Sequence, residues 1–223
     1  MALKQKNTMP RTQKILQHFK GTTCHIFNRG VQKDKIFLED EDYIFYLKRI
    51  KKYKEMYGIE FLNYNLLPNH FHYTIRQKDD SEQSNQCHLL GEQMAQKTQR
   101  TPISKFMHVL HNSYAHYFNK KYKRSGHVFQ DRYKQRIVED DSYIMWLSAY
   151  INGNAQIHKI VEDAKDWLYS SYLDYIGKRN GTICNNKEII QTYFSSVDEY
   201  KQYVYEVVKD SQEKKEALKS LEE

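Results

Sequence analysis

Two short runs, 59–68 (IEFLNYNLLP) and 70–77 (HFHYTIRQ), constrain the fold of this chain most strongly. Both are rich in aromatic and β-branched residues, as buried strands are, and they meet at the turn-forming pair Pro68-Asn69. The connection suits a hairpin turn or an abrupt junction between strands. In either case the neighbouring elements must assemble around a sheet.

The rest of the chain alternates between strand and helix patterns. A strand pattern at 22–30 precedes a helical one at about 41–57, and after the two central strands a second helix begins at Thr101-Pro102. A strand is expected at 127–138 and a helix from 139 to about 151, with Gly153-Asn154 near its end. This order predicts an α+β sandwich of one antiparallel sheet, with helices mainly on one side.

Composition changes mark the predicted domain boundaries. Residues 1–20 form a basic N-terminal arm, 21–178 the main domain, and 78–100 a polar, Gln-rich insertion within it. Residues 179–223 form a C-terminal helical extension, whose charge-rich end lacks Gly and Pro. Tyr200, Val204 and Val207/Val208 recur at helical spacing, so this end could pack back on the domain or join two subunits as a homodimer.

The net charge of +7 and the pI of about 9.0 favour an anionic partner. Nucleic acid ranks before a membrane, because the sequence contains no long apolar run and no lipidation motif. Cys24, Cys87 and Cys184 form no C-x-x-C pair and follow no signal peptide, which predicts a reduced, cytoplasmic protein.

His70 and His72 stand two residues apart on a predicted strand, so both rings project to one face while Phe71 and Tyr73 project to the other. Two imidazoles at this spacing can hold one divalent cation and leave other coordination positions open. The alternative is a pair of ordinary hydrogen-bonded histidines, which is the commoner origin of an isolated H-x-H. The absence of H-E-x-x-H, zinc-finger cysteines and a Gly-rich phosphate loop disfavours a structural zinc site or a nucleotide hydrolase.

If a cation at this pair polarises a phosphodiester, the chemistry also needs an attacking oxygen, and the chain has 19 tyrosines. Tyr150 and Asn154 lie four residues apart on one predicted helix face, so a hydroxyl and an amide oxygen could approach the cation together. The alternatives are a core tyrosine and a C-cap asparagine.

Several segments in order resemble the His-hydrophobe-His tyrosine transposases of the IS200/IS605 type, most closely the branch associated with repetitive extragenic palindromes (REP). They are CHIFNRGVQKDKIFLEDEDYIFYLKRI, LLPNHFHYTI, SYAHYFNKKYKRSGHVFQDRYKQRIVEDDSYIMWLSAYINGN and DWLYSSYLDYIG, and they span about residues 22–177. Two features depart from the family: Asn154-Ala155 stands where Asn-Pro is usual, and the excursion at 78–100 is longer and more polar.

The resemblance implies a ferredoxin-like sandwich and an enzyme that cuts and rejoins single-stranded or hairpin DNA. In such an enzyme a tyrosine forms a 5′-phosphotyrosine link and frees a 3′-OH, with Mg²⁺ or Mn²⁺ bound at the two histidines. The corresponding residues here are Tyr150 as nucleophile and His70, His72 and Asn154 as metal ligands. The competing interpretation is a domesticated protein that binds structured DNA without cutting it.

Basic residues near these motifs are predicted to contact DNA phosphates. Each alone could equally be a solvated charge. They lie on the predicted basic strand and at the preceding helix exit: Arg132, Lys134 and Arg136, and Lys120, Lys121, Lys123 and Arg124.

Overall fold

The computed structural model describes residues 21–78 and 101–222. Its centre is a β-α-β-β-α-β unit: β1 (Thr23–Arg29), α2 (Asp40–Met56), β2 (Ile59–Leu67), β3 (His70–Gln77), α4 (Pro102–Lys121) and β4 (Lys134–Ile137). The four strands form one antiparallel sheet in the order β2-β3-β1-β4. This is the ferredoxin-like arrangement, so the predicted α+β class is confirmed.

The junction at Pro68-Asn69 is a tight turn between β2 and β3, which pair from Leu67↔His70 to Ile59↔Gln77 with one irregularity between Phe61 and Asn63. Because side chains alternate along a strand, Phe71, Tyr73 and Ile75 of β3 enter one face of the sheet. His70, His72 and Thr74 enter the other. The hairpin therefore sets which face is apolar and which carries the histidines.

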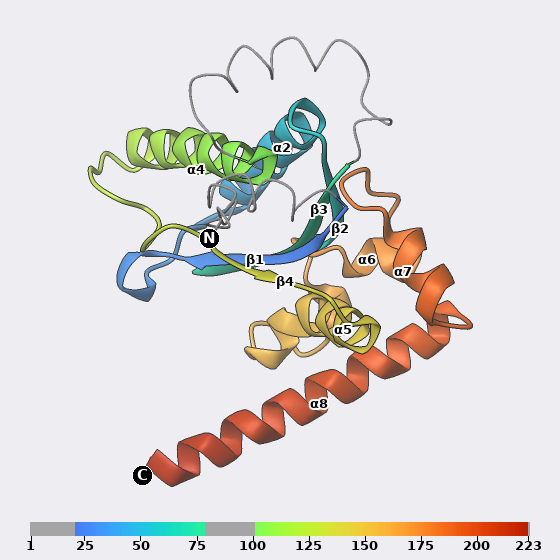
Figure 1. Ribbon diagram of the computed structural model, residues 1–223. Coiled ribbons are helices and arrows are strands. Elements are labelled where there is room, and N and C mark those ends of the chain that lie inside the picture. Colours follow the sequence, from blue (N-terminus) through green and yellow to red (C-terminus); the bar gives the residue numbers. More distant parts are fainter. Residues whose placement is uncertain (1–20, 79–100, 223) are drawn as a thin grey trace, which may run out of the picture.

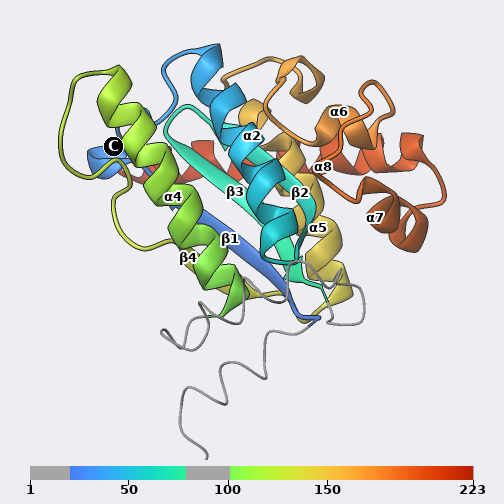
Figure 2. The ribbon, with the colours of Figure 1, turned by 90° about the horizontal axis from the view of Figure 1, so that it is seen from above.

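Helices α2 and α4 lie side by side over the apolar face (Figure 2). The N-terminus of α4 is capped as the sequence predicts, because Thr101 Oγ1 accepts a hydrogen bond from the Ser104 amide at 3.1 Å and Pro102 opens the helix. Cys24, Ile26, Phe71, Tyr73 and Phe106 are fully buried in the core between these helices and the sheet.

The opposite face is covered by α5 (Asp141–Ile157), and α8 (Val197–Glu222) packs on the outer side of α5 (Figure 1). The expectation of helices mainly on one side is therefore wrong. The helix was also predicted to end near Ile151, but it continues through Gly153 and Asn154. Val208 of α8 packs over Gly153, and a Cβ at that glycine would lie 2.4 Å from Val208 Cγ2, so the two helices approach closely.

The predicted strand at 127–138 is much shorter in the structure, where β4 covers only Lys134–Ile137 and an isolated bridge joins Phe129 to Gly30. Phe129 instead turns toward α4 and stacks on the His111 ring at 4.0 Å between centroids. Packing against the helix thus overrides the strand pattern before Lys134, and Arg132 lies outside the strand.

Short elements close the β2 side of the sheet: η3 (Ala164–Asp166), α6 (Tyr172–Tyr175) and α7 (Asn186–Tyr193), while η1 (Val31–Lys33) follows β1. Isolated bridges join Asn65 to Ser170 and Phe61 to Cys184. Within the described residues β4, at the other end of the sheet, pairs with β1 alone. Among the described residues the sheet therefore has one covered edge, at β2, and one open edge, at β4.

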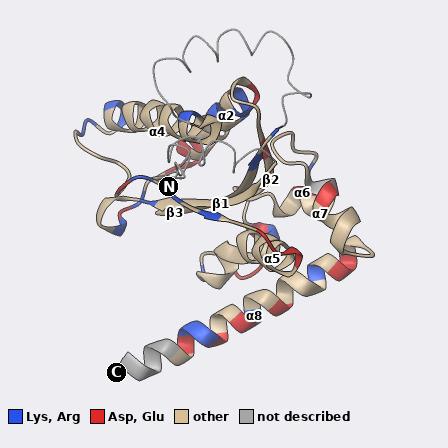
Figure 3. Cartoon of the chain, in the orientation of Figure 1, with Lys and Arg blue, Asp and Glu red and all other residues tan. Residues whose placement is uncertain are grey.

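The C-terminal extension consists of α7 and α8, and α8 carries charges of both signs along its length (Figure 3). Tyr200, Val204 and Val208 are buried against α5, so this stretch packs back on the domain. A homodimer stays a prediction. The predicted arm at 1–20 and nearly all of the insertion at 78–100 lie outside the described residues. Among the helices that are described, none has both the length and the apolar character needed to cross a bilayer.

Candidate active site

Four of the residues singled out by the sequence come together between the sheet and α5. His70 and His72 project from β3 toward the helix, and their ring centroids lie 5.3 Å apart. From α5, the Tyr150 ring meets His72 edge-on at 5.9 Å between centroids, and Asn154 Oδ1 lies 3.3 Å from His70 Nε2. One helical turn separates Tyr150 from Asn154, which is why each faces one histidine.

The position of α5 over the histidines is fixed from both sides. Asn65 of β2 donates from Nδ2 to the Ile151 carbonyl at 2.7 Å, and Asn65 is also the register partner of His72. On the outer side, Asn152 Nδ2 donates to the Tyr200 hydroxyl at 2.7 Å. These buried bonds hold the helix in one rotation about its axis, which is the rotation that turns Tyr150 and Asn154 toward β3.

Hydrogen bonds on His70 define which ring nitrogen is free. Asn69 donates from Nδ2 to the Lys33 carbonyl at 3.2 Å, so its Oδ1 is the atom 2.6 Å from His70 Nδ1. A carbonyl oxygen only accepts, so His70 Nδ1 carries the proton and Nε2 presents a lone pair. That lone pair faces Asn154 Oδ1, a second acceptor, while the buried Asn154 Nδ2 has no hydrogen-bond partner among the described residues.

His72 is oriented by His25, which the sequence reasoning did not single out. His72 Nδ1 lies 3.0 Å from His25 Nε2, and His25 is 7% exposed. If His72 donates from Nδ1, its Nε2 keeps a lone pair for a ligand, as histidines that bind metal commonly do. His25 was overlooked because it lies 47 positions away in sequence, and only the β1–β3 pairing brings it beside His72.

Every histidine in this group has a lowered pKa. Burial, followed by the neighbouring His158, lowers the pKa of His70 to about 4, and burial with Arg136 nearby lowers that of His25 to about 4. Burial, and then the adjacent His70 and His25, lower the pKa of His72 well below 6.5. The rings are therefore neutral at pH 7, the state that can donate a lone pair to a cation.

Tyr150 is half-buried and lies beside His72 at the edge of the histidine group. Its ring stacks on Trp146, one turn earlier on α5, at 4.9 Å between centroids and 15° between planes. The packing fixes the ring against α5, while the structure described here shows no hydrogen bond to the hydroxyl. Tyr150 is thus neither a fully buried core residue nor anchored through its oxygen.

The residues fit a divalent cation by their donor chemistry. Two lone pairs that face each other repel unless a cation lies between them or the Asn154 amide turns over to donate from Nδ2, and ligands at adjacent corners of an octahedral shell lie about 3 Å apart. The 3.3 Å between His70 Nε2 and Asn154 Oδ1 is close to that value. Imidazole nitrogens are softer ligands than Mg²⁺ prefers and suit Mn²⁺ better, while the amide oxygen suits either ion. Among the described residues no three of His, Cys, Asp or Glu form such a group, so the set depends on the amide of Asn154.

Two of the predicted DNA contacts share this face of the sheet. Lys134 is the register partner of Phe27 and Arg136 that of His25, so both side chains project to the α5 side, and both are exposed. Arg29, which sequence reasoning missed, is the register partner of His70 and is exposed at the end of β1. These three cations line the approach from the open β4 edge to the histidines.

The other predicted contacts lie on the α4 side. Lys120, Lys123 and Arg124 are exposed at the end of α4, and Arg132 is exposed in the segment before β4. Lys121 is held internally, since its Nζ lies 2.5 Å from Glu39 Oε1 and 3.0 Å from Asp42 Oδ1. Of the predicted set, Lys121 is the residue whose charge is already matched within the protein.

His158 is a further residue near the site that the sequence did not indicate. It caps the C-terminus of α5, and its ring centroid lies 4.9 Å from that of His70. Lys215 of α8 lies 3.2 Å from His158 Nδ1, so the C-terminal extension reaches the edge of the histidine group. Burial, together with Lys215, lowers the pKa of His158 to about 4.

Comparison with known proteins gives a likeness to a solved structure. No protein-family model and no curated protein matches the sequence. Among solved structures the chain is similar to a REP-associated tyrosine transposase bound to a REP hairpin, with a TM-score of 0.49 and 14% identity over 83% of this chain and 94% of the other. A likeness at this level carries no argument about function.

Proposed function

We propose that this protein cleaves and rejoins single-stranded DNA, with Tyr150 as nucleophile and with Mg²⁺ or Mn²⁺ bound by His70, His72 and Asn154. One observation carries the proposal: α5 brings a tyrosine and an amide, one turn apart, over the two histidines of β3. Three residue types that a metal-assisted phosphoryl transfer needs thus converge from two distant segments.

The reaction follows from these roles. The Tyr150 oxygen attacks the phosphorus of a DNA phosphodiester, a Tyr–O–P bond forms, and the P–O3′ bond breaks. The tyrosine proton is lost and the departing 3′ oxygen gains one, which leaves a free 3′-OH and a 5′-phosphotyrosine. A bound divalent ion would supply Lewis acidity at the phosphate. Because the phosphotyrosine is itself a diester, attack by another 3′-OH rejoins DNA without a nucleotide cofactor.

The charge distribution supports a polyanionic substrate at this face. Arg29, Lys134 and Arg136 are exposed beside the histidines, and cations near a reacting phosphate both bind the backbone and stabilise its charge. Lys134 and Arg136 lie on the edge strand β4 and Arg29 lies at the end of β1, so a DNA strand that follows these cations reaches the histidines without unfolding of α5.

The proposal is tested by incubating the protein with a labelled library of single-stranded DNA hairpins and Mn²⁺, then resolving covalent adducts on a denaturing gel. We expect an adduct with the unaltered protein and none with Tyr150→Phe, with His70→Ala, or in EDTA. Tyr143→Phe is the matched control, since Tyr143 is also half-buried on α5 and also stacks on Trp146.

Two results would contradict the proposal. An adduct that persists in Tyr150→Phe would exclude this residue as nucleophile. Tight binding of hairpins with no adduct from any of them, at any Mn²⁺ concentration, would favour the non-cleaving DNA binder instead.

A further inference from the structure

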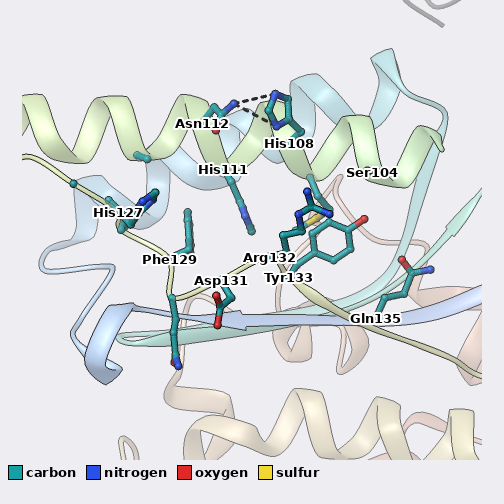
Figure 4. A pocket seen from close by; sticks show the side chains of 15 residues that line it. Ser104, His108, His111, Asn112, His127, Phe129, Asp131, Arg132, Tyr133 and Gln135 are labelled. Atoms are coloured by element: carbon teal, nitrogen blue, oxygen red, sulfur yellow. Dashed lines mark hydrogen bonds between the residues drawn. The ribbon is translucent and has the colours of Figure 1, made fainter. Parts of the chain in front are cut away.

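A pocket of about 850 Å³ lies on the other side of the sheet from His70 and His72. It is bounded by α4 above and by the segment 126–135 below (Figure 4). None of the proposed catalytic or metal-binding residues lines it. Its walls include Ser104, His111, Asn112, Phe129, Arg132 and Tyr133.

The walls combine flat rings with hydrogen-bonding groups. The His111 ring stacks on Phe129 at 4.0 Å and 17°, and the Tyr133 ring stands edge-on to His111 at 6.5 Å between centroids. In Figure 4 His111 reaches down from α4, while Tyr133 and Arg132 approach from the segment below. Asn112 on α4 lines the pocket with its amide nitrogen 3.1 Å from His108 Nε2 (Figure 4), which leaves its oxygen available, and the exposed Arg132 adds a positive charge. Rings, amide and cation are the groups that bind a base and its phosphate.

The size of the pocket also suits such a ligand. Pockets of about 300–1,000 Å³ hold single small molecules, and one nucleotide falls in that class, whereas a paired duplex does not. An unpaired nucleotide is therefore the unit of DNA that this pocket admits.

The wall of the pocket is attached to the catalytic face. The Gln130 amide donates to the Arg29 carbonyl at 2.9 Å, and Asn28 Nδ2 donates to the Asp131 carbonyl at 3.0 Å. Arg29 is in turn the register partner of His70. The segment that forms the pocket floor is thus fixed to the strand that lies beside the proposed active site.

The open edge at β4 connects the two sides. Arg132 lies on the pocket side of this edge, and Lys134 and Arg136 lie on the α5 side. A polyanionic strand can therefore stay in contact with cations while it passes from one face of the sheet to the other. This explains why the basic residues predicted from one stretch of sequence occupy two layers of the fold.

We propose that the pocket between α4 and segment 126–135 binds one unpaired nucleotide of the DNA strand whose phosphate lies at His70 and His72, with the strand crossing the β4 edge. The position of the phosphate at His70 and His72 rests on the proposed function; the binding of a nucleotide in the pocket does not. The base packs against Tyr133 with Asn112 at its edge, and Arg132 contacts the phosphate. The pocket then selects substrates that present an unpaired base at a set distance from the scissile bond.

The test measures whether binding depends on bases. Fluorescein-labelled dT20 and an abasic strand of the same length are titrated with the full-length protein in EDTA, and fluorescence anisotropy gives both dissociation constants. We expect dT20 to bind about tenfold more tightly than the abasic strand, the scale of one stacked base. Tyr133→Leu and, separately, Asn112→Ala are expected to reduce this ratio toward one while leaving abasic binding unchanged.

Tyr205→Leu is the matched control for the tyrosine variant, because Tyr205 is 58% exposed on α8. Asn112 is exposed, so its replacement tests the pocket even if Tyr133→Leu fails to fold. The inference is overturned if dT20 and the abasic strand bind equally. It is also overturned if both pocket variants weaken the binding of dT20 and of the abasic strand to the same extent. The same conclusion follows if Tyr205→Leu reduces the ratio of the two dissociation constants as strongly as the pocket variants do.

The two proposals fail in different ways. A Tyr150 adduct in the cleavage assay, together with no base preference in the titration, would overturn the pocket alone. A base preference lost in the pocket variants, together with no adduct on any hairpin, would uphold the pocket as a nucleotide site and overturn the cleavage reaction.

Discussion

The two faces of one sheet differ sharply in what they bury. On β3, Phe71, Tyr73 and Ile75 enter an aromatic core beneath α2 and α4, while the alternating residues His70, His72 and Thr74 enter a polar layer beneath α5. Both sets belong to a single strand of 8 residues, so the difference comes from side-chain alternation alone.

The polar layer is costly to the fold. Asn63 is 1% exposed, and neither of its amide atoms has a hydrogen-bond partner in the described part of the chain. Thr74 Oγ1 and His25 Nδ1 are also buried without a hydrogen-bond partner there. Leaving a buried polar atom without a partner costs about 1–3 kcal/mol. Water could satisfy several of these groups. Among the described residues the α4 face buries unpaired polar atoms as well, at the Tyr46 and Tyr73 hydroxyls and at His111 Nε2. The two faces therefore differ mainly in that the residues of β3 facing α4 are aromatic or aliphatic, while those facing α5 are polar.

Neighbouring residues on β3 give the most direct test of this division. Phe71→Ala should lower the free energy of unfolding by about 3–5 kcal/mol, because it empties a fully buried aromatic site. His72→Ala should cost far less stability but abolish the covalent adduct. Urea unfolding and the adduct assay on both variants check this. If His72→Ala destabilised the protein as much as Phe71→Ala, the two faces would not differ as described.

His25 tests whether the polar face orients the His72 ring through a hydrogen bond. His25→Phe removes the partner of His72 Nδ1, so we expect the affinity for Mn²⁺ and the rate of adduct formation to fall by about 10–100-fold. His25→Gln places an acceptor oxygen near the position of Nε2 and should restore most of both. Mn²⁺ titration followed by thermal shift separates this from a folding defect. Equal losses in the two variants would mean that His25 acts by packing alone.

The contact between α5 and α8 tests whether the polar face depends on the helix outside it. Gly153→Ala would place a Cβ 2.4 Å from Val208 Cγ2, and this overpacking should cost about 1–3 kcal/mol despite the higher helix propensity of alanine. Adding Val208→Ala should relieve the clash and recover adduct formation. Calorimetry on the single and double variants provides the measurement. If Gly153→Ala were more stable than the original protein, α8 would have shifted to accommodate the added methyl group without cost.

The smallest expected effect is a pH dependence that arises on the α4 face. Burial, with His108 as the lesser cause, lowers the pKa of His111 to about 3. The unfolded chain takes up this proton near pH 6.5 and the native state does not, so stability is full above 6.5 and falls as the pH drops toward 3. His111→Leu should make this decline shallower in urea unfolding between pH 7 and 5. His116→Leu, at an exposed site on the same helix, is the control and should leave the slope nearer that of the original protein.

Much of the fold was predictable from local patterns. The Thr101-Pro102 cap is a short-range feature that the structure confirms, and at Pro68-Asn69 the structure shows the hairpin turn, one of the two connections that the sequence allowed. The strand expected at 127–138 failed because Phe129 packs on His111, a tertiary contact that alternation cannot reveal. Helix α5 extends further than predicted because Gly153 serves close packing with Val208 rather than helix termination.

The site was predictable only in part. Periodicity placed His70 with His72, and Tyr150 with Asn154, each on one face of its own element. That the two pairs meet depends on α5 covering the second face of the sheet, which the element order did not indicate. His25 and Arg29 join the site through strand register, and His158 through the unexpected length of α5.

The alternation on β3 also limits how this segment can change during evolution. Inserting or deleting one residue within the strand would rotate every later side chain to the opposite face. Histidines would then enter the aromatic core and phenylalanine the polar layer, so a single indel would remove stability and the proposed site together. Point substitutions at either face are separable events. The strand is therefore expected to vary in its residues while keeping its length.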